Sequence, residues 1–186
     1  MKAYDIKEES PLYSVKRAQY KTLRLEPYTV LYAKTTAKIH SPEYQKVVNN
    51  LLSDAKDLQI LHKSIEANFK MPPLEISVYK DKREYEFRMP IPNITAQKLR
   101  EHMNLLNSRT EVRTIDLGWV LATQHDGFGD KPEPSLSKLI EYSKNCNQTI
   151  TGERIQLILS DPSTTMPSRY KTILVLPVDW KIRKYK

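Results

Sequence analysis

The chain has 186 residues, of which 39% are hydrophobic and 28% charged, and its formal net charge is +8. This composition is typical of a soluble globular protein, and the length suits one domain with one core. No apolar run approaches the ~20 residues of a membrane span, so we expect no membrane-spanning helix and no membrane partner. The single cysteine, Cys146, excludes an internal disulfide. Because residues 1–10 are charged and lack an apolar segment, we expect a cytoplasmic protein.

The positive charge is concentrated at the end of the chain. Four basic side chains lie in the last six positions: Lys181, Arg183, Lys184 and Lys186. We interpret residues 179–186 as a solvated basic tail, and the alternative is a surface that attracts an acidic partner. The sequence has no helix-turn-helix signature, zinc-finger spacing or aromatic RNA-binding strand, so we expect no nucleic-acid partner.

The chain begins with a polar extension, residues 1–19, followed by strands. Four side chains in the extension are candidate anchors: Tyr4, Leu12, Tyr13 and Val15. Residues 22–36 are predicted to form one or two strands bent at Pro27, because proline is confined to the ends, edges and bulges of strands.

The clearest helix follows. Ser41 is a suitable N-cap, Pro42 suits the first helical position, and Glu43 complements the helix dipole. Apolar side chains then recur at intervals of three and four: Tyr44, Val47, Val48, Leu51, Leu52, Ala55 and Leu58. This spacing predicts one apolar face that packs on a sheet.

A first hairpin is predicted over residues 74–90. Apolar and polar side chains alternate over residues 74–79 and again over 85–89, with a charged turn between them and Pro90 at the end. A helix within residues 93–108, carrying Leu99, Met103 and Leu106, would join this hairpin to the second half.

The second half repeats the same order. Residues 112–116 and 119–122 are predicted strands, and a helix is expected to start near Glu133 or Ser135. A second hairpin pairs residues 155–159 with 173–176 through a wide connection of about a dozen residues, and Pro177 is expected to end it.

The two halves therefore indicate an α+β fold built from a duplicated strand-helix-strand-strand unit, with an offset of about 90 residues. Two halves of one domain are a better interpretation than two domains at this length. We divide the chain into an extension, a first half, a linker helix, a second half and a tail: residues 1–19, 20–92, 93–108, 109–178 and 179–186.

The second hairpin also carries a resemblance to a known family. Leu159-Ser160-Asp161-Pro162, Pro167, Lys171-Thr172 and Pro177-Val178 resemble the closing signature of the GyrI-like small-molecule-binding superfamily, which includes gyrase inhibitors and the effector-binding domains of bacterial transcription activators. The stretch from Trp119 to Gly127 is similar to the strand in which members often carry His and Gly before the second helix. The resemblance covers roughly residues 20–178.

The resemblance implies a pseudo-two-fold antiparallel sheet domain whose helices flank a central cleft. In this family, aromatic side chains in the cleft hold hydrophobic and often cationic ligands. Members that bind ligands or hydrolyse them place a glutamate just inside the last strand, where this chain has Ile173; the equivalent position of the first half is Glu86. The implied function is a stand-alone, non-catalytic effector-binding domain for a small hydrophobic or aromatic molecule.

Six side chains are our candidates for this ligand site: Glu86, Tyr32, Tyr85, Trp119, His125 and Tyr170. A buried carboxylate stabilises a cation or acts as a base, and aromatic rings stack or make cation–π contacts. For Glu86 the alternative is an outward-facing strand residue opposite Lys or Arg. For each aromatic ring it is a place in the core or at a rim.

The remaining chemistry is sparse. His40, His62 and His102 are scattered without ligand spacing, so we expect no metal and no cofactor. Cys146 and the serines near His125 lack the context of a catalytic triad, so we expect no enzyme. Two further functions stay open. One is a protein-interaction module for an acidic or gyrase-like partner, and the other, ranked last, is a hydrolase that depends on Glu86.

Overall fold

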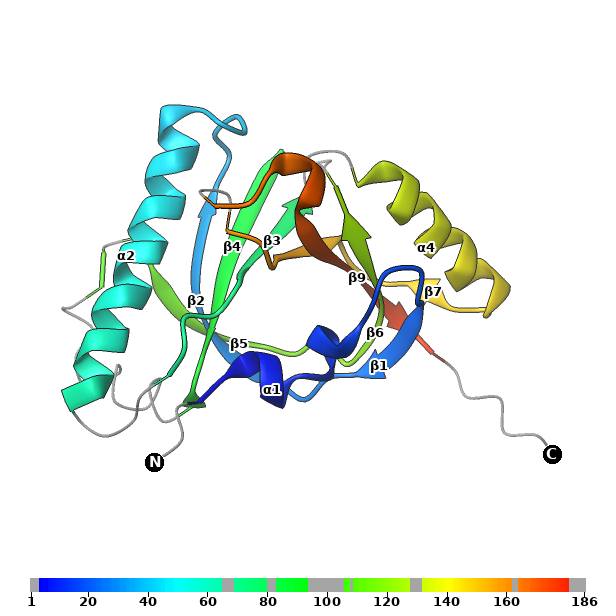
Figure 1. The fold of residues 1–186 in the computed structure, drawn as a ribbon, viewed down its shortest axis with the longest axis horizontal. Coiled ribbons are helices and arrows are strands. Elements are labelled where there is room, and N and C mark those ends of the chain that lie inside the picture. Colours follow the sequence, from blue (N-terminus) through cyan, green and yellow to red (C-terminus); the bar gives the residue numbers. More distant parts are fainter. Residues whose placement is uncertain are drawn as a thin grey trace. The chain divides into compact units, whose positions relative to one another are not determined.

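The computed structural model describes residues 4–64, 69–79, 83–93, 106–107, 109–127, 132–161 and 164–180. The chain divides into two compact units: the first contains residues 1–10 and 27–116, and the second contains residues 11–26 and 117–186. In each unit a helix packs on an antiparallel sheet (Figure 1), and this confirms the predicted α+β class. No helix in the described ranges is long and apolar enough to span a membrane.

The sheet of the first unit has four antiparallel strands in the order β3-β4-β2-β5. Their bounds are Leu74–Tyr79 for β3, Glu84–Ile91 for β4, Tyr28–Thr35 for β2 and Glu111–Ile115 for β5. The predicted first hairpin is therefore present as β3 and β4. The long helix α2, Pro42–Ser64, lies along this sheet (Figure 1).

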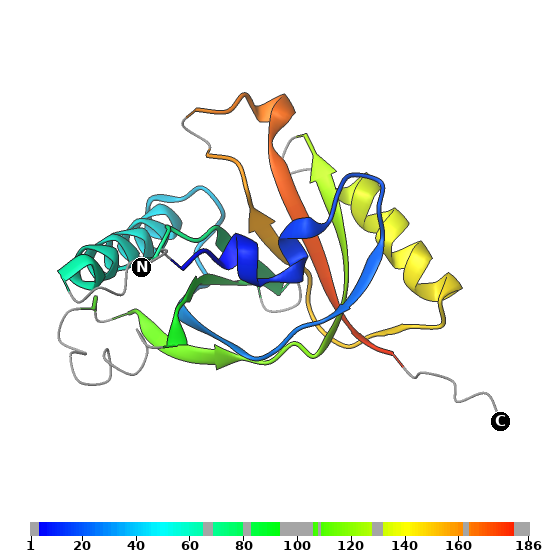
Figure 2. The ribbon, with the colours of Figure 1, turned by 60° about the horizontal axis from the view of Figure 1, so that its bottom comes forward.

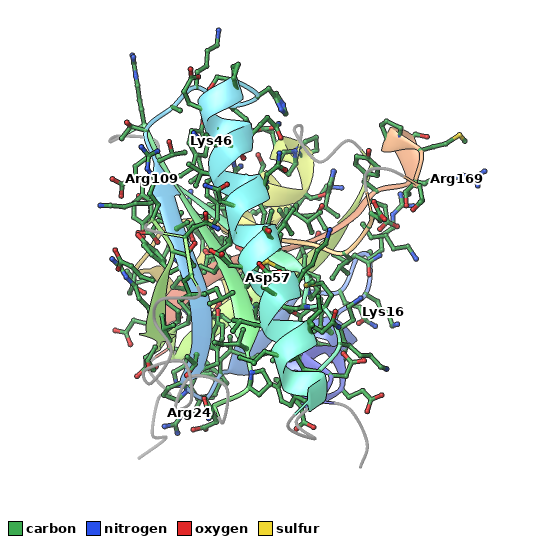
Figure 3. All side chains as sticks on the ribbon, turned by 90° about the vertical axis from the view of Figure 1, so that its left-hand side faces the viewer. Lys16, Arg24, Lys46, Asp57, Arg109 and Arg169 are labelled. Carbon is green, nitrogen blue, oxygen red and sulfur yellow. The ribbon has the colours of Figure 1, made fainter. Side chains whose placement is uncertain are left out.

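Helix α2 begins where the sequence predicts. The Ser41 hydroxyl accepts a hydrogen bond from the Tyr44 backbone N–H at 3.2 Å, which is the geometry of an N-cap. The predicted apolar face packs on the sheet through five buried side chains: Tyr44, Val47, Leu51, Ala55 and Leu58. Polar side chains project from the opposite side of α2, and Figure 3 labels Lys46 and Asp57 among them.

The second unit contains β1 (Lys21–Arg24), β6 (Trp119–Asp126), β9 (Lys171–Asp179) and β8 (Ile155–Ile158) in that order, and β7 (Thr149–Ile150) also pairs with β9. Helix α4, Glu133–Asn145, starts where predicted and lies alongside β6 and β9 (Figure 2). It packs through Leu139 with Leu136 and Ile140, which their spacing of three and four residues places on one side of the helix.

The opening strand of each sequence half pairs within the other compact unit. Strand β1 pairs with β6, so that Lys21 lies opposite Ala122, and β5 pairs with β2, so that Ile115 lies opposite Tyr28. The compact units therefore differ from the sequence halves by an exchange of β1 and β5. The division into extension, domain and tail stays a prediction.

The N-terminal extension is folded in the described part. Tyr4 bridges to Phe69, and α1 spans Ile6–Glu9 in the first unit. The 3-10 helix η1, Pro11–Ser14, belongs to the second unit, where Leu12 and Val15 are buried. Tyr4 and Tyr13 pack, partly buried, against the cores of the first and second units, so the four predicted anchors are confirmed.

Two prolines were expected to end strands, and that expectation is wrong. Pro177 lies inside β9 opposite Val120, and Pro90 lies inside β4 opposite Val30. Pro177 lacks an N–H but its carbonyl accepts from the Thr151 N–H at 3.0 Å, so the strand continues to Asp179. The predicted linker helix falls mostly outside the described residues, as do residues 181–186 of the tail.

Candidate functional site

In the first unit the sheet has one apolar face and one polar face. Leu31, Phe87 and Met89 belong to the core beneath α2. Because side chains alternate along a strand, their neighbours point to the opposite side. The polar face, as we call it, consists of Tyr28, Tyr32, Lys34, Glu75, Ser77, Tyr79, Glu84, Glu86, Arg88, Glu111 and Arg113.

Glu86 is the centre of this polar face. Its carboxylate accepts from the Tyr32 hydroxyl at 2.9 Å, from the Tyr79 hydroxyl at 3.2 Å and from Arg88 Nη2 at 2.8 Å. Burial favours the neutral acid, but the hydrogen bonds from Arg88 and Tyr32 outweigh it, so the pKa of Glu86 lies below its usual value. Glu86 is therefore an ionised carboxylate held by three donors.

Tyr32 connects Glu86 to a second ion pair. The guanidinium of Arg113 lies over the Tyr32 ring, 3.6 Å from its centroid, and is paired with Glu111 at 2.7 Å. Burial, with the hydrogen bond to Glu86, raises the pKa of Tyr32. The Tyr32 side chain thus remains a neutral hydroxyl donor whose ring is covered by a cation.

Arg88 is buried beside Glu86. Its side chain is 6% exposed, and it lies opposite Tyr32 on one neighbouring strand and opposite Glu75 on the other. Burial disfavours the guanidinium charge, but the hydrogen bond to Glu86 and the nearby carboxylates keep its pKa above the usual value. Arg88 is therefore a fixed positive charge within the polar face.

Glu75 is the second carboxylate next to Arg88. It is 2% exposed and accepts a hydrogen bond from the Tyr28 hydroxyl at 2.8 Å. Burial raises the pKa of Glu75 to about 7, although the bond from Tyr28 and the charge of Arg88 oppose the rise. Glu75 and Glu86 therefore both lie next to Arg88, but the pKa of Glu75 is raised and that of Glu86 is lowered.

The corresponding face of the second unit is apolar. Ile173, at the position of the family glutamate, is fully buried together with Val175 and Leu157. Leu12, within helix η1, and Val15, directly after it, pack into the same cluster. The chain's own N-terminal segment therefore covers this face. Because Ile173 replaces the glutamate, this face offers a ligand no carboxylate at that position.

The structure brings together two of the six predicted site residues, Tyr32 and Glu86. Tyr85 precedes Glu86 on β4 and therefore points to the α2 side, where its ring meets Tyr44 edge-on with centroids 5.3 Å apart. The alternative for Tyr85, a place in the core, describes its position best. For Glu86 the alternative was a strand residue opposite Lys or Arg, and Lys34 does lie opposite it on β2.

The other three predicted residues belong to the second unit. Trp119 packs with the α4 cluster and meets Trp180 edge-on, with centroids 4.7 Å apart. His125 is buried in β6, with Nδ1 2.9 Å from the Ser135 hydroxyl. The Tyr170 carbonyl accepts from the Gly127 N–H at 2.9 Å. Each thus has a local structural contact, and a ligand role for them stays a prediction.

Glu75, Ser77 and Arg88 are members of the polar face that the sequence interpretation missed. The alternation over residues 74–79 did mark Glu75 and Ser77 as the polar side of a strand. Their importance depends on the register that places Arg88 opposite Glu75 and Glu86 opposite Ser77. Within the described residues there is no group of three or more His, Cys, Asp or Glu that could hold a metal ion.

A cavity of about 290 Å³ lies elsewhere in the first unit, beside α2. Its lining consists of Asp54, Asp57, Leu58, Ile60, Leu61 and Leu106. The buried Asp54 carboxylate accepts from the Asn107 backbone N–H and side-chain amide and from the Thr110 hydroxyl. We interpret Asp54 as a structural clamp that ties α2 to Asn107 and Thr110.

Comparisons with known proteins give the fold. No model of a protein family matches the sequence, and no curated protein matches it. Among solved structures, a hydrolase from Listeria innocua is similar over 96% of this chain and 100% of its own, with a TM-score of 0.78 at 21% identity. An uncharacterised conserved protein from the same organism has a TM-score of 0.79 at 20% identity, with the same coverage.

A third neighbour is the C-terminal domain of EcmrR. It is similar over 87% of this chain and 97% of its own, with a TM-score of 0.59 at 10% identity. The chain has the fold of these proteins. This result is consistent with the resemblance to the GyrI-like superfamily that the sequence indicates.

Proposed function

We propose that this chain is a non-catalytic binding module for a small hydrophobic or aromatic molecule, held at the polar face of the first unit. The observation that carries the proposal is the convergence of Tyr32, Tyr79 and Arg88 on the Glu86 carboxylate. The fold shared with GyrI-like proteins supports the same function.

The polar face has the composition of a small-molecule site. Such sites combine aromatic surface with a few polar groups in fixed positions. Tyr28 and Tyr79 supply partly exposed aromatic surface, and their hydroxyls, like that of the buried Tyr32, are fixed by bonds to Glu75 or Glu86. A site whose polar groups are already ordered loses little side-chain entropy when the ligand binds, which favours affinity.

A thermal-shift screen of the full chain against aromatic acids, aromatic alcohols and lipophilic cations tests the proposal. A ligand at a hundredfold excess over its dissociation constant stabilises the folded state by about 2.7 kcal/mol. We expect Tyr32→Phe and Glu86→Gln to weaken the shift of a binding compound and Tyr20→Phe, a matched change in the second unit, to leave it intact. No shift with any of the three classes would refute the proposal.

A hydrolase is the second candidate. The Listeria innocua neighbours include two proteins described as hydrolases. In addition, Glu75 has a pKa of about 7 next to Arg88, and a carboxyl group with that pKa suits general acid–base catalysis near neutral pH. Under this alternative the full chain hydrolyses aromatic esters and loses turnover in Glu75→Gln and Glu86→Gln; under our proposal the wild type shows no turnover.

A protein-interaction module is the third candidate. It rests on the last six residues, 181–186, whose four basic side chains carry half of the formal net charge of +8. Removal of residues 181–186 would abolish association with an acidic protein partner under this alternative. Under our proposal the same removal leaves the binding of a small aromatic compound unchanged.

A further inference from the structure

We infer that the ligand of the polar face carries an anionic hydrogen-bond acceptor, such as a carboxylate, and that Arg88 and Ser77 bind it. The inference rests on the proposed function, because it names the chemical class of the molecule that the same site binds. It differs from the cationic ligands that the family resemblance implies.

Arg88 supplies the first argument. A guanidinium has five N–H donors, and Nη2 of Arg88 donates to Glu86. Nε and Nη1 are buried and have no hydrogen-bond partner among the described residues. A buried charged donor without an acceptor destabilises the protein, so these two nitrogens favour an acceptor supplied by a ligand. The planar fork of arginine suits the two oxygens of a carboxylate.

Ser77 supplies a second donor on the same face. It is 1% exposed, and its hydroxyl has no hydrogen-bond partner in the described part of the chain. Ser77 lies opposite Glu86 in the β3–β4 ladder, and Arg88 is two positions further along β4. Such diagonal neighbours lie roughly 7–8 Å apart, a distance that the long arginine side chain spans. One acceptor group can therefore receive bonds from both residues.

The carboxylates of the polar face supply the third argument, because each already has a partner. Glu86 pairs with Arg88 at 2.8 Å, Glu111 pairs with Arg113 at 2.7 Å, and Glu84 lies 3.7 Å from Lys34. Glu75 accepts from the Tyr28 hydroxyl. A cationic ligand would have to displace one of these donors, whereas an anionic ligand meets N–H groups of Arg88 that no described residue occupies.

Isothermal titration of the full chain with three probes that share one ring tests the inference. The probes are 2-naphthoate, 2-naphthylmethanol and the 2-naphthylmethylammonium ion. We expect 2-naphthoate to bind about tenfold more tightly than either of the others, which is the effect of one charge-assisted hydrogen bond. Arg88→Lys keeps the charge but loses the fork, and we expect it to reduce this preference to about threefold or less.

Ser77→Ala is the milder variant and serves if Arg88→Lys fails to fold; it should weaken 2-naphthoate binding severalfold without changing the other probes. Ser53→Ala is the matched control, since Ser53 is exposed on α2 and lies outside the polar face. Equal or tighter binding of the ammonium probe overturns the inference and leaves the proposed function standing. So does a carboxylate preference that survives Ser77→Ala and Arg88→Lys. If none of the three probes binds, the proposed function fails as well.

Discussion

Arg88 lies directly opposite Glu75 in the β3–β4 ladder, yet its guanidinium pairs with Glu86 on its own strand, with Nη2 2.8 Å from the carboxylate. Glu75 accepts a hydrogen bond from the Tyr28 hydroxyl instead and is 2% exposed. The two carboxyl groups consequently differ, since Glu86 has a lowered pKa and Glu75 a pKa of about 7.

The raised pKa of Glu75 predicts a pH-dependent stability. The folded pKa of about 7 exceeds the ordinary value of 4.5, so between these values the folded chain keeps a proton that the unfolded chain releases. The free energy of unfolding therefore falls as the pH rises from 4.5 to 7, by about 3 kcal/mol from this group, and this contribution is constant above pH 7.

Glu75→Gln, which resembles the neutral acid, removes the decline. Urea unfolding at pH 5 and pH 8 measures it, with the exposed Glu141→Gln as the control; equal pH slopes for wild type and Glu75→Gln would contradict the expectation.

The N-terminal segment should stabilise the second unit. Leu12 is 4% exposed in the cluster that contains Ile173 and Val175. Leu12→Ala leaves a cavity in this cluster, and we expect it to lower the free energy of unfolding by about 2–4 kcal/mol. Denaturant unfolding measures the loss, with the exposed Lys16→Ala as the control, for which a change within about 0.5 kcal/mol is expected. A Leu12→Ala protein as stable as wild type would mean that the segment does not cover the sheet.

A glutamate at position 173 should not restore the family's site. Ile173 is fully buried among apolar side chains, and the register places it opposite Leu157 and Gln124. Ile173→Glu buries a carboxyl group without a partner and should lower the free energy of unfolding by about 3 kcal/mol or more. Ile173→Val, the matched control, should cost about 1 kcal/mol. A stable Ile173→Glu protein that gains affinity for lipophilic cations would show that the second-unit face is open.

The Asp54 clamp predicts a contrast along α2. Asp54 is 1% exposed and accepts bonds from Asn107 and Thr110, whereas Asp57, one turn further on, is exposed (Figure 3). Asp54→Ala leaves buried donors without their acceptor and should lower the free energy of unfolding by about 2–3 kcal/mol. Asp57→Ala should change it by less than about 0.5 kcal/mol. If the two changes lowered the free energy of unfolding equally in urea, Asp54 would not have this structural role.

Much of the fold follows from local patterns in the sequence. The three- and four-residue spacing of apolar side chains and the Ser41-Pro42 start locate α2. Alternation locates the first hairpin, and two apolar runs separated by turn residues locate the second. The exchange of β1 and β5 does not follow from such patterns, because it depends on pairing between strands about 90 residues apart. The continuation of β9 through Pro177 likewise depends on pairing between strands, because the neighbouring backbone at Thr151 needs the Pro177 carbonyl as an acceptor and not an N–H at that position.

The candidate site was predictable only in its parts. Alternation along β4 should have separated Tyr85 from Glu86, since adjacent strand residues point to opposite faces. That Tyr32 and Glu86 meet depends on the β2–β4 register, which places Tyr32 opposite Arg88. The role of Arg88 also had no local signal, because an arginine within a strand is usually a solvent-exposed residue.

The most direct test of ligand binding at the polar face is the pattern of amide shifts in ¹H–¹⁵N spectra, recorded with whichever naphthyl probe binds most tightly. We expect the shifted amides to cluster in β2, β3 and β4, around residues 28–34, 75–79 and 84–88, and the cluster to disappear in Tyr32→Phe combined with Glu86→Gln. Shifts concentrated in β8 and β9 of the second unit, or unchanged shifts in the double variant, would contradict it.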